Sequence, residues 1–554
     1  MNKATSCLSG VTDPPLTDLT IGELLARAVK NNPEQEAIVS LHQNIRLSYS
    51  ELDEVSDSFA KGLIDFGLEK GDRIGIWSPN YVEWIITMYA ASKLGLILVN
   101  VNPAYRPLEL EFALNKVECK ALVLASSFKT SDYPGILESV APEVTTCEVG
   151  ALNAKRLPSL KALVLISDQP RDGYASFNDV VAAGKSSSFD LDAVKRQVDC
   201  HMPVNIQFTS GTTGTPKGAT LTHHNIVNNG SNVGTGIKLN AKDRVCAPVP
   251  LYHCFGMVMA TLACVSHGAT LVLPNDAFEP AGTLDAVQKE ACTALYGVPT
   301  MFGAMLDEPD FEKYDLRSLR TGIVAGSLCS QVLTTRIVEQ MNMTEVTNCY
   351  GMTETSPVSF QSATDDPMDK RVKTVGSIHP HVQVKVVNSN REIVPRGVPG
   401  ELCTKGYSVM KGYWGDVQKT EESVIDGWMF TGDQAVIDED GYCAIVGRIK
   451  DTIIRGGENI APKEIEDYLI THPAISEAQA FGVKNEKFGE VVAVWIKLKE
   501  GSELSEQQLR EFCTDQIAYF KVPALIRFVG EFPLTVTGKI QKYKMREQME
   551  KEIS

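Results

Sequence analysis

The feature that most constrains this chain is the alternation of strand-like and helix-like segments along most of its length. Apolar residues recur at helical spacing over residues 21–29, 49–66 and 81–94, while residues 73–77 and 121–125 are short, largely apolar runs. Apolar positions repeated every three to four residues form one face of a helix, and short apolar runs between turns are typical of buried strands. Strands that alternate with longer helices fold into largely parallel sheets. We therefore predict an α/β fold.

The pattern changes after about residue 375. Short β-rich runs such as residues 382–387 are separated by turn dipeptides such as Asp440-Gly441, which predicts a β-rich subdomain. Helices and strands alternate again from about Lys450. We expect residues 1–449 to form a large N-terminal domain of two α/β subdomains plus the β-rich one. Residues 450–554 would form a small, mobile α+β C-terminal domain.

Composition excludes several classes of protein. The 554 residues carry a formal net charge of −16, whereas nucleic-acid-binding proteins usually present a basic face. The 13 cysteines contain no C-x-x-C pair, which favours reduced and mostly buried thiols. No apolar run approaches the roughly 20 residues of a membrane-spanning helix. We expect no nucleic-acid partner and no transmembrane segment, and the sequence predicts no particular oligomeric state.

The most specific local feature is the segment TSGTTGTPKG, residues 209–218. It follows a strand-like run and precedes a helix that we expect to open near Thr222. For the earlier helix at residues 49–66, we expect Ser50 to be the N-terminal cap. Glycines let backbone N–H groups approach an anion, hydroxyls add rotatable donors, and a lysine supplies positive charge. The glycine spacing differs from that of a Walker A loop. We predict a polyphosphate-binding loop rather than a flexible linker, made of Thr209, Ser210, Gly211, Thr212, Thr213, Gly214, Thr215, Pro216 and Lys217.

Four later segments fit the same chemistry, although each has a commonplace alternative. In YGMTET, Thr353 can donate to a phosphate oxygen and Glu354 is a hard oxygen ligand suited to Mg²⁺, but the pair alone is typical of a helix cap. In WMFTGD, the carboxylate of Asp433 lies in a turn-like context and can accept hydrogen bonds from a ribose diol. GRIKDTIIRGG alone resembles a charged turn and strand. PLTVTGKIQK carries Lys539 just after a turn, where a solvated basic end is the ordinary interpretation.

Taken together and in order, these segments resemble the motif series of the adenylate-forming superfamily, which contains acyl-CoA synthetases, luciferases and peptide-synthetase adenylation domains. The strings NPAYRPLELEFAL, LYHCFG and GYWGD are most similar to the medium-chain branch typified by acyl-CoA synthetase family member 2. The resemblance implies a medium-chain fatty acid–CoA ligase that uses ATP with Mg²⁺ and coenzyme A, and proceeds through an acyl-adenylate. The alternatives are an acyl-AMP ligase that loads a carrier protein, a luciferase-like oxygenase, another adenylate-forming enzyme, and a nucleotide-bound scaffold without turnover.

The resemblance also implies roles for residues at matching motif positions. The loop at residues 209–217 would hold the β- and γ-phosphates of ATP, Thr353 would contact the α-phosphate and Glu354 would bind Mg²⁺. The other nucleotide contacts would be made by Gly326, Ser327, Tyr350, Asp433, Arg448 and Lys539, the first three around the adenine and the next two on the ribose.

A domain movement is implied as well. Lys539 would bridge the α-phosphate and the acyl carboxylate during adenylation, acting as a catalytic residue. Rotation about a hinge at Lys450 would then replace it with Gly456 and Gly457, which would line the channel for coenzyme A.

The acyl pocket is expected to be apolar, which suits an aliphatic or aromatic acid. The residues at the matching positions are His253, Phe255, Gly256, Met257, Val324, Met352 and Val358. Ordinary core packing is an equal alternative for Met257 and Val324, and His253 is either a gate residue or a core histidine.

The resemblance points to the mitochondrion as the site of action. The first residues, MNKATSCLSG, have neither a signal-peptide core nor an Arg-rich amphipathic pattern, so the cytoplasm is the alternative.

Overall fold

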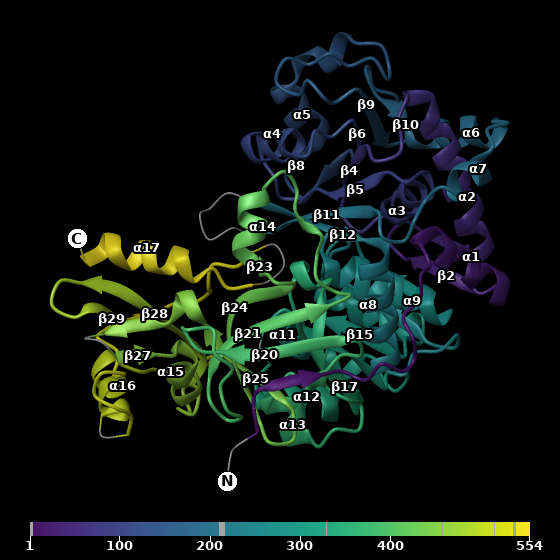
Figure 1. Cartoon of the computed structure of the whole chain (residues 1–554). Coiled ribbons are helices and arrows are strands. Elements are labelled where there is room, and N and C mark those ends of the chain that lie inside the picture. The colour runs from purple at the N-terminus through teal and green to yellow at the C-terminus, as the bar shows by residue number, and fades with distance from the viewer. Residues whose placement is uncertain are drawn as a thin grey trace. The chain divides into compact units, whose positions relative to one another are not determined.

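The computed structural model of the chain describes residues 4–209, 216–327, 329–455, 458–514, 516–535 and 539–553. Its contacts divide the chain into two compact units. The large unit consists of Ser9–Gln383 and Thr404–Met429, and the small unit of Met1–Leu8, Val384–Cys403 and Phe430–Ser554. Figure 1 shows the course of the chain and labels the elements.

The first sheet of the large unit has eight strands, whose central members are parallel. The antiparallel strands β12 and β22 extend it on one side. In sheet order the strands are β10 (Ala175–Ser176), β9 (Ala162–Ile166), β6 (Ala121–Ala125), β4 (Arg73–Trp77), β5 (Ile97–Asn100), β11 (Pro203–Thr209), β12 (Lys217–Thr222) and β22 (Gly412–Tyr413).

The second sheet has nine strands, and it too is parallel in the centre with antiparallel strands at both edges. In sheet order they are β19 (Ser377–Ile378), β18 (Val358–Gln361), β17 (Glu345–Gly351), β16 (Thr321–Ala325), β15 (Ala294–Gly297), β13 (Arg244–Cys246), β14 (Thr270–Leu273), β2 (Glu36–Ser40) and β3 (Ile45–Ser48). The predicted α/β fold with largely parallel sheets is confirmed.

Helices cover both sheets of the large unit. They are α1 (Ile21–Asn31), α2 (Tyr49–Leu63), α3 (Val82–Leu94), α4 (Pro107–Lys116), α5 (Tyr133–Val140), α6 (Phe177–Ser186), α7 (Leu191–Lys195), α8 (His223–Gly236), α9 (Ala263–His267), α10 (Pro280–Lys289), α11 (Pro299–Leu306), α12 (Gln331–Gln340), α13 (Met368–Lys373) and α14 (Val417–Ser423).

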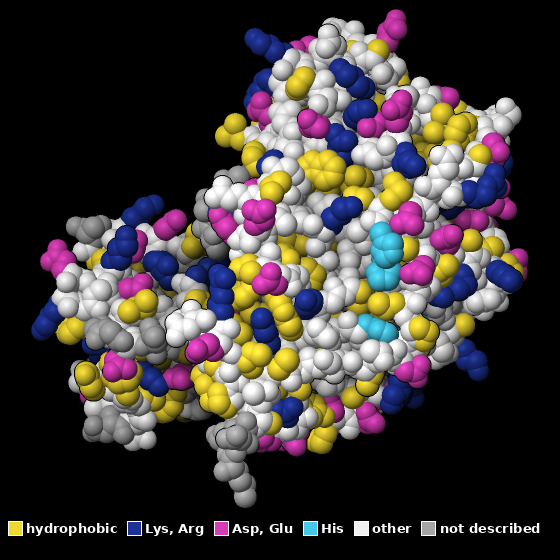
Figure 2. All heavy atoms as spheres, viewed as in Figure 1, with side chains coloured by type: hydrophobic (Ala, Val, Ile, Leu, Met, Phe, Trp, Pro, Cys, Tyr) yellow, Lys and Arg dark blue, Asp and Glu magenta, His cyan; other side chains and the backbone are white. Residues whose placement is uncertain are grey.

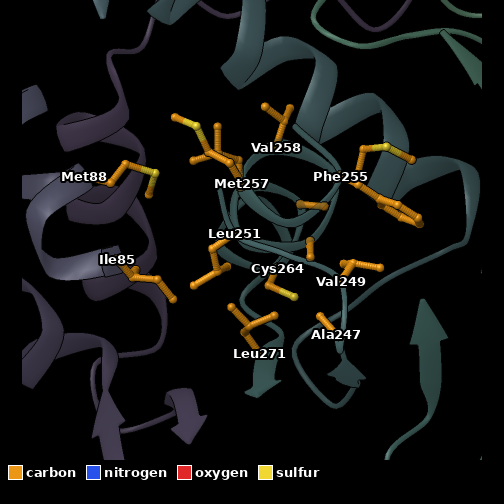
Figure 3. Close-up of a cluster of buried hydrophobic side chains, with 14 of the residues drawn as sticks. Ile85, Met88, Ala247, Val249, Leu251, Phe255, Met257, Val258, Cys264 and Leu271 are labelled. Atoms are coloured by element: carbon orange, nitrogen blue, oxygen red, sulfur yellow. The ribbon is translucent and has the colours of Figure 1, made fainter. Parts of the chain in front are cut away.

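One apolar core joins the two sheets of the large unit. Because strand side chains alternate between faces, Ala121 and Val123 of β6 belong to this core, while Leu122 and Leu124 belong to a second core under α4 and α5. Helix α3 is buried on nearly every side, as expected of a helix that is apolar all round. Figure 3 shows Ile85 and Met88 of α3 in the apolar cluster formed around the segment from Ala247 to Leu271.

The small unit contains a β-rich part. Its strands belong to one sheet, in which neighbouring strands follow the order β1 (Cys7–Ser9), β20 (Val382–Val387), β21 (Gly400–Gly406) and β24 (Trp428–Ile437). Strand β25 (Cys443–Arg448) also pairs with β24.

The other part of the small unit is an α+β fold on a five-stranded sheet. Its strands are β27 (Glu458–Ile460), β26 (Ile453–Arg455), β29 (Gly489–Leu498), β28 (Ile475–Asn485) and β30 (Leu525–Phe528), the last paired with β29. Figure 1 shows α17 (Lys542–Ile553) on one side of β28 and β29, and α15 (Pro462–Leu469) and α16 (Glu506–Cys513) on the other. Alternate strand residues accordingly divide between two apolar cores.

Helix starts follow capping chemistry, and one cap differs from the predicted residue. Thr222 caps α8 as expected, its hydroxyl accepting from the Asn225 backbone. The cap of α2 is Ser48 rather than Ser50, because Ser48 forms a reciprocal capping box with Glu51 and the helix therefore begins at Tyr49.

The cysteines are free and mostly buried thiols, as predicted from the composition. All 13 cysteines are described and free of disulfides, and most are buried, Cys7 being exposed and Cys147 half-buried. Among the described helices, none is both long and apolar enough to cross a bilayer.

A buried lysine of α3 forms ion pairs with two carboxylates of α2. The side chain of Lys93 is 1% exposed, and its Nζ lies 2.7 Å from Asp53 Oδ1 and 2.6 Å from Asp57 Oδ1. Lys195 contacts the other oxygen of Asp57 from a half-exposed position. Burial alone would raise the pKa of Asp57, but the charges of Lys93 and Lys195 outweigh burial and lower it.

We predict that Lys93→Ala lowers the free energy of unfolding by about 3 kcal/mol at neutral pH, since it leaves two carboxylates without their buried partner. Lys195→Ala is the matched control and should cost less than about 1 kcal/mol, because that pair is solvent-screened. A carboxylate with a lowered folded-state pKa contributes stability above its unfolded pKa and loses it as the pH falls. The Lys93 penalty should therefore shrink from pH 7 to pH 3 in urea denaturation, and equal penalties for both variants would contradict this account.

Candidate functional site

A buried carboxylate joins three distant segments of the large unit. Glu354, which is 5% exposed, lies in a short 3₁₀ turn that follows β17. Its Oε1 accepts hydrogen bonds from Thr209 Oγ1 at 3.0 Å and from Tyr413 Oη at 2.9 Å. The structure therefore brings together two residues from separate predicted motifs, Thr209 and Glu354, and adds Tyr413.

Strand pairing positions Tyr413. Strand β22 pairs with β12, with Tyr413 opposite Ala219, and the next residue, Trp414, donates its backbone N–H to the Gly218 carbonyl at 2.7 Å. The Met410 backbone N–H donates to the Glu354 carbonyl at 2.9 Å. Strand β12 and the Glu354 turn are thus both hydrogen-bonded to the segment around Tyr413.

A lysine lies beside the tyrosine that contacts this carboxylate. The ammonium of Lys217 lies over the Tyr413 ring, 4.7 Å from its centroid. Burial and the Glu354 charge both raise the pKa of Tyr413, so its hydroxyl remains a donor. A small pocket adjoins the ring, and its lining residues are Phe112, Lys116, Pro216, Lys217, Gly218, Tyr413, Trp414, Asp416 and Lys419.

The donor set at Glu354 fits a hard divalent cation. Carboxylate and hydroxyl oxygens are the ligands that Mg²⁺ prefers, and it usually binds through one or two carboxylates together with substrate phosphates. Lys217 beside the pocket suits an anionic partner for such an ion. The remaining members of the predicted loop, Ser210 to Thr215, lie outside the described residues.

Thr353 is adjacent to the LYHCFG segment. Its side chain is buried, and its Oγ1 lies 3.9 Å from Cys254 Sγ. Nδ1 of His253 lies 3.6 Å from the same sulfur and accepts a hydrogen bond from the Phe255 backbone at 3.2 Å. The predicted phosphate-contact residue and the predicted acyl-pocket segment therefore meet.

The predicted adenine contacts lie at the carboxyl ends of two neighbouring strands of the second sheet. Gly326 and Ser327 follow β16, and Tyr350 is near the end of the neighbouring parallel strand β17. Ligands of open α/β sheets bind at the carboxyl ends of such strands. Gly326 has φ +91°, and a Cβ there would lie 3.0 Å from a Val298 methyl group, so glycine suits this position.

The predicted acyl-pocket residues are mainly buried. Figure 3 shows Phe255 and Met257 within the apolar cluster, from the π-helix Phe255–Leu262. Val324 and Val358 are also buried, Met352 is half-buried and packs against the core, and a Cβ on Gly256 would collide with the Pro250 carbonyl. Burial agrees with core packing and with a lining role alike, so the pocket remains a prediction.

A polar ladder beside Met257 was not predicted. Nδ2 of Asn205 donates to Asn100 Oδ1 at 2.9 Å, and Nε2 of Gln207 donates to Asn205 Oδ1 at 2.9 Å. The amides of Asn100 and Gln207 each lie 3.7 Å from the Met257 sulfur. The strand-like run VNIQF contains Asn205 and Gln207. These polar residues at alternate positions of a strand are the sequence signal that could have indicated the ladder.

The small unit holds the other predicted residues. Asp433 is buried, and its Oδ1 lies 3.0 Å from Arg448 Nε, the two residues being paired across β24 and β25. Asp433 therefore lies within a strand and not in the expected turn, because Gly432, at φ +71°, bends the strand without ending it. The side chain of Glu401 accepts from the Gly432 backbone at 3.1 Å.

The last predicted residues are exposed positions of the small unit. Lys450 is in a short 3₁₀ turn. The backbone N–H of Lys539 donates to Thr535 Oγ1 at 3.0 Å, and its carbonyl accepts from the Thr535 backbone at 2.7 Å. Gly456 and Gly457, the predicted channel residues, lie outside the described part of the chain.

The chain is similar to known proteins over nearly its whole length. Residues 25–414 match the family model of the AMP-binding enzymes, and residues 464–539 match that of the AMP-binding enzyme C-terminal domain. The chain is 46% identical over 547 residues to a Bos taurus protein named medium-chain acyl-CoA ligase ACSF2, mitochondrial, covering 97% of this chain and 89% of that protein.

A bacterial relative and a solved structure are similar as well. A putative acyl-CoA synthetase, YngI, of Bacillus subtilis is 44% identical over 532 residues, covering 96% of this chain and 97% of its own. The crystal structure of the anthranilate CoA ligase AuaEII in complex with anthranoyl-AMP matches with a TM-score of 0.86 at 25% identity, covering 98% of this chain and 99% of that one.

The hydrogen bond between Tyr413 and Glu354 can be measured without any ligand. Tyr413→Phe should lower the free energy of unfolding by about 2 kcal/mol, since a hydrogen bond to a buried charge is lost. Glu354→Gln should raise it by about 1 kcal/mol, because a desolvated charge is removed. When Glu354→Gln is already present, the Tyr413→Phe change should cost only about 1 kcal/mol. Urea denaturation of the unmodified chain, the two single variants and the double variant measures this coupling, and an equal cost in both backgrounds would contradict it.

Proposed function

The chain belongs to the family of AMP-binding enzymes, and on that premise we propose that it is a medium-chain fatty acid–CoA ligase. It is an AMP-forming acyl-CoA ligase, so its substrates are ATP, a carboxylic acid and coenzyme A. The preference for medium-chain acids is supported by the name and the near full-length similarity of the bovine relative. The observation that carries the proposal is the buried Glu354 carboxylate held by Thr209 and Tyr413 beside Lys217.

The first half-reaction forms a mixed anhydride. An oxygen of the fatty acid carboxylate attacks the α-phosphorus of ATP, the bond from that phosphorus to the bridging oxygen breaks, and pyrophosphate leaves. Both reactants are anions, so fixed positive charge must lie between them in the transition state. We assign this role to Lys539, with Thr353 donating to an α-phosphate oxygen and the loop at residues 209–217 holding the β- and γ-phosphates.

Several groups would position the nucleotide. Glu354 would hold Mg²⁺, which offsets the charge of the ATP phosphates when bound, and the Tyr413 hydroxyl orients that carboxylate. Gly326, Ser327 and Tyr350 would frame the adenine. Asp433 would accept hydrogen bonds from the ribose hydroxyls, since its carboxylate is fixed by Arg448.

The second half-reaction forms the thioester. The sulfur of coenzyme A attacks the acyl carbonyl carbon, the bond from that carbon to the phosphate oxygen breaks, and AMP leaves. We propose that residues 450–554 rotate as a domain against residues 1–449 about Lys450, so that Gly456 and Gly457 replace Lys539 at the reacting groups. Such a rotation separates the two chemical steps.

The acid would enter an apolar pocket. His253, Phe255, Gly256, Met257, Val324, Met352 and Val358 are the proposed lining. Their apolar character suits an alkyl chain, because burying each methylene is favourable by about 0.8 kcal/mol.

We also propose the mitochondrion as the place of action. This proposal rests on the name of the bovine relative. Similarity to the family does not by itself indicate the compartment, because the Bacillus subtilis relative comes from a bacterium. Fractionation of cells that express the native gene tests it, and recovery in the cytoplasm would contradict it.

The substrate proposal is tested by measuring acyl-CoA and pyrophosphate formation with saturated acids from C4 to C16, with and without coenzyme A. We expect the highest kcat/KM for medium-chain acids and a pyrophosphate release that requires the acid. A flat profile, or a maximum at C16, would contradict the medium-chain assignment. Adenylate that forms but transfers only to a carrier protein would instead identify a carrier-loading ligase.

Separate assays of the two half-reactions test Lys539. Lys539→Ala should slow adenylation by roughly 10²–10³-fold, since one transition-state contact is lost. Thioester formation from synthetic acyl-adenylate should be nearly unchanged. Lys544→Ala removes a nearby exposed lysine and is the matched control, expected to leave both steps intact. Equal losses of both half-reactions in Lys539→Ala would contradict the domain rotation.

A further inference from the structure

A cluster of potential metal ligands lies on the large unit, formed by residues that the proposed reaction does not use. A carboxylate oxygen of Asp18, the thiol of Cys200 and a ring nitrogen of His201 all lie within 4.8 Å of one another. His224 is next to them, its Nε2 being 3.8 Å from Asp18 Oδ1 and its ring centroid 4.8 Å from that of His201. Figure 2 shows histidine side chains at the molecular surface.

Three chain segments meet here, and hydrogen bonds hold them together. Thr17, which precedes Asp18, donates its backbone N–H to Asn228 Oδ1 at 2.8 Å, and its carbonyl accepts from Asn228 Nδ2 at 2.9 Å. Asn228 belongs to α8. A few residues further along, the Ile21 backbone N–H donates to His223 Nδ1 at 3.1 Å. The segment that carries Asp18 is therefore fixed to the start of α8.

The loop that carries the other two ligands is fixed in the same way. The backbone N–H of His224 donates to the Cys200 carbonyl at 2.8 Å. The His201 backbone N–H donates to Asp199 Oδ1 at 2.8 Å, which closes a tight turn around Cys200. Backbone hydrogen bonds thus position the segments that carry the three ligands.

The donor types select a class of ion. Thiolate, imidazole and carboxylate together are the ligands of Zn²⁺, which binds sulfur at about 2.3 Å and nitrogen or oxygen at about 2.0–2.2 Å. Mg²⁺ and Ca²⁺ prefer sites made entirely of oxygen. Cys200 is buried and Asp18 and His201 are exposed, so an ion would meet a sulfur from the protein side and keep one face toward solvent.

We propose that Asp18, Cys200 and His201 form a binding site for a zinc-class divalent cation, with His224 as a positioning residue beside them. The ion would link the segment before α1 to the loop after α7, and both segments are hydrogen-bonded to α8, which directly follows β12. The proposal does not depend on the proposed ligase activity, because none of its residues belongs to the ATP, acyl or coenzyme A contacts.

The test is titration of the full chain, freed of metal with a chelator, with Co²⁺ as a spectroscopic probe for Zn²⁺. We expect one equivalent to give a thiolate-to-cobalt charge-transfer band that Zn²⁺ abolishes. Cys200→Ser should lose the band, while Cys7→Ser, which removes an exposed cysteine elsewhere, should keep it. His201→Ala, an exposed position, should weaken affinity at least tenfold while leaving the melting temperature of the metal-free protein unchanged.

Two outcomes would overturn the site. One is the absence of a charge-transfer band at stoichiometric Co²⁺, and the other is a band that survives in Cys200→Ser. Zn²⁺ should also raise the melting temperature of the unmodified chain and not that of His201→Ala, since a ligand bound only to the folded state stabilises it. An equal rise in both proteins would contradict the assignment.

Discussion

The hydrogen bonds that converge on Glu354 are the interaction on which the rest of the site depends. The carboxylate is buried, and the hydroxyls of Thr209 and Tyr413 come from segments 145 and 59 residues away in the sequence. A buried charge is costly unless it is hydrogen-bonded. The pairing of β22 with β12 brings Tyr413 to this carboxylate. The two sheets and their shared core thus bring these three residues together.

Local charge matters more than total charge in this protein. The chain carries a formal charge of −16, yet its substrates ATP, fatty acid and coenzyme A are all anions. Three lysines, Lys116, Lys217 and Lys419, line the pocket beside Tyr413, and Arg448 pairs with Asp433 in the small unit. Coulomb attraction at a few ångströms far exceeds the screened repulsion of distant surface charges. A negative total charge is therefore compatible with local positive charge beside Tyr413.

The sequence predicts the bounds of strands better than it predicts which side chains contact each other in the folded chain. Strands at Arg73–Trp77 and Ala121–Ala125 have the bounds expected from their apolar runs, because period and turn chemistry are local. The cap of α2 was placed two residues late, since Ser48 and Ser50 both precede acidic residues and only the folded capping box distinguishes them. Tyr413 was not predicted as a partner of Glu354, because the register of β22 against β12 depends on the tertiary fold. Asp433 was expected in a turn, but pairing with Arg448 extends the strand through it.

Activation of the acid as an acyl-adenylate can be followed through the oxygen atoms of its carboxylate. The fatty acid is labelled with ¹⁸O in both carboxylate positions, and the AMP formed in one turnover with ATP and coenzyme A is analysed by mass spectrometry. Attack by the carboxylate on the α-phosphorus, followed by cleavage of the acyl carbon–oxygen bond, transfers one labelled oxygen to AMP. We expect AMP with one ¹⁸O atom and unlabelled pyrophosphate. Unlabelled AMP, or label in the pyrophosphate, would contradict this route.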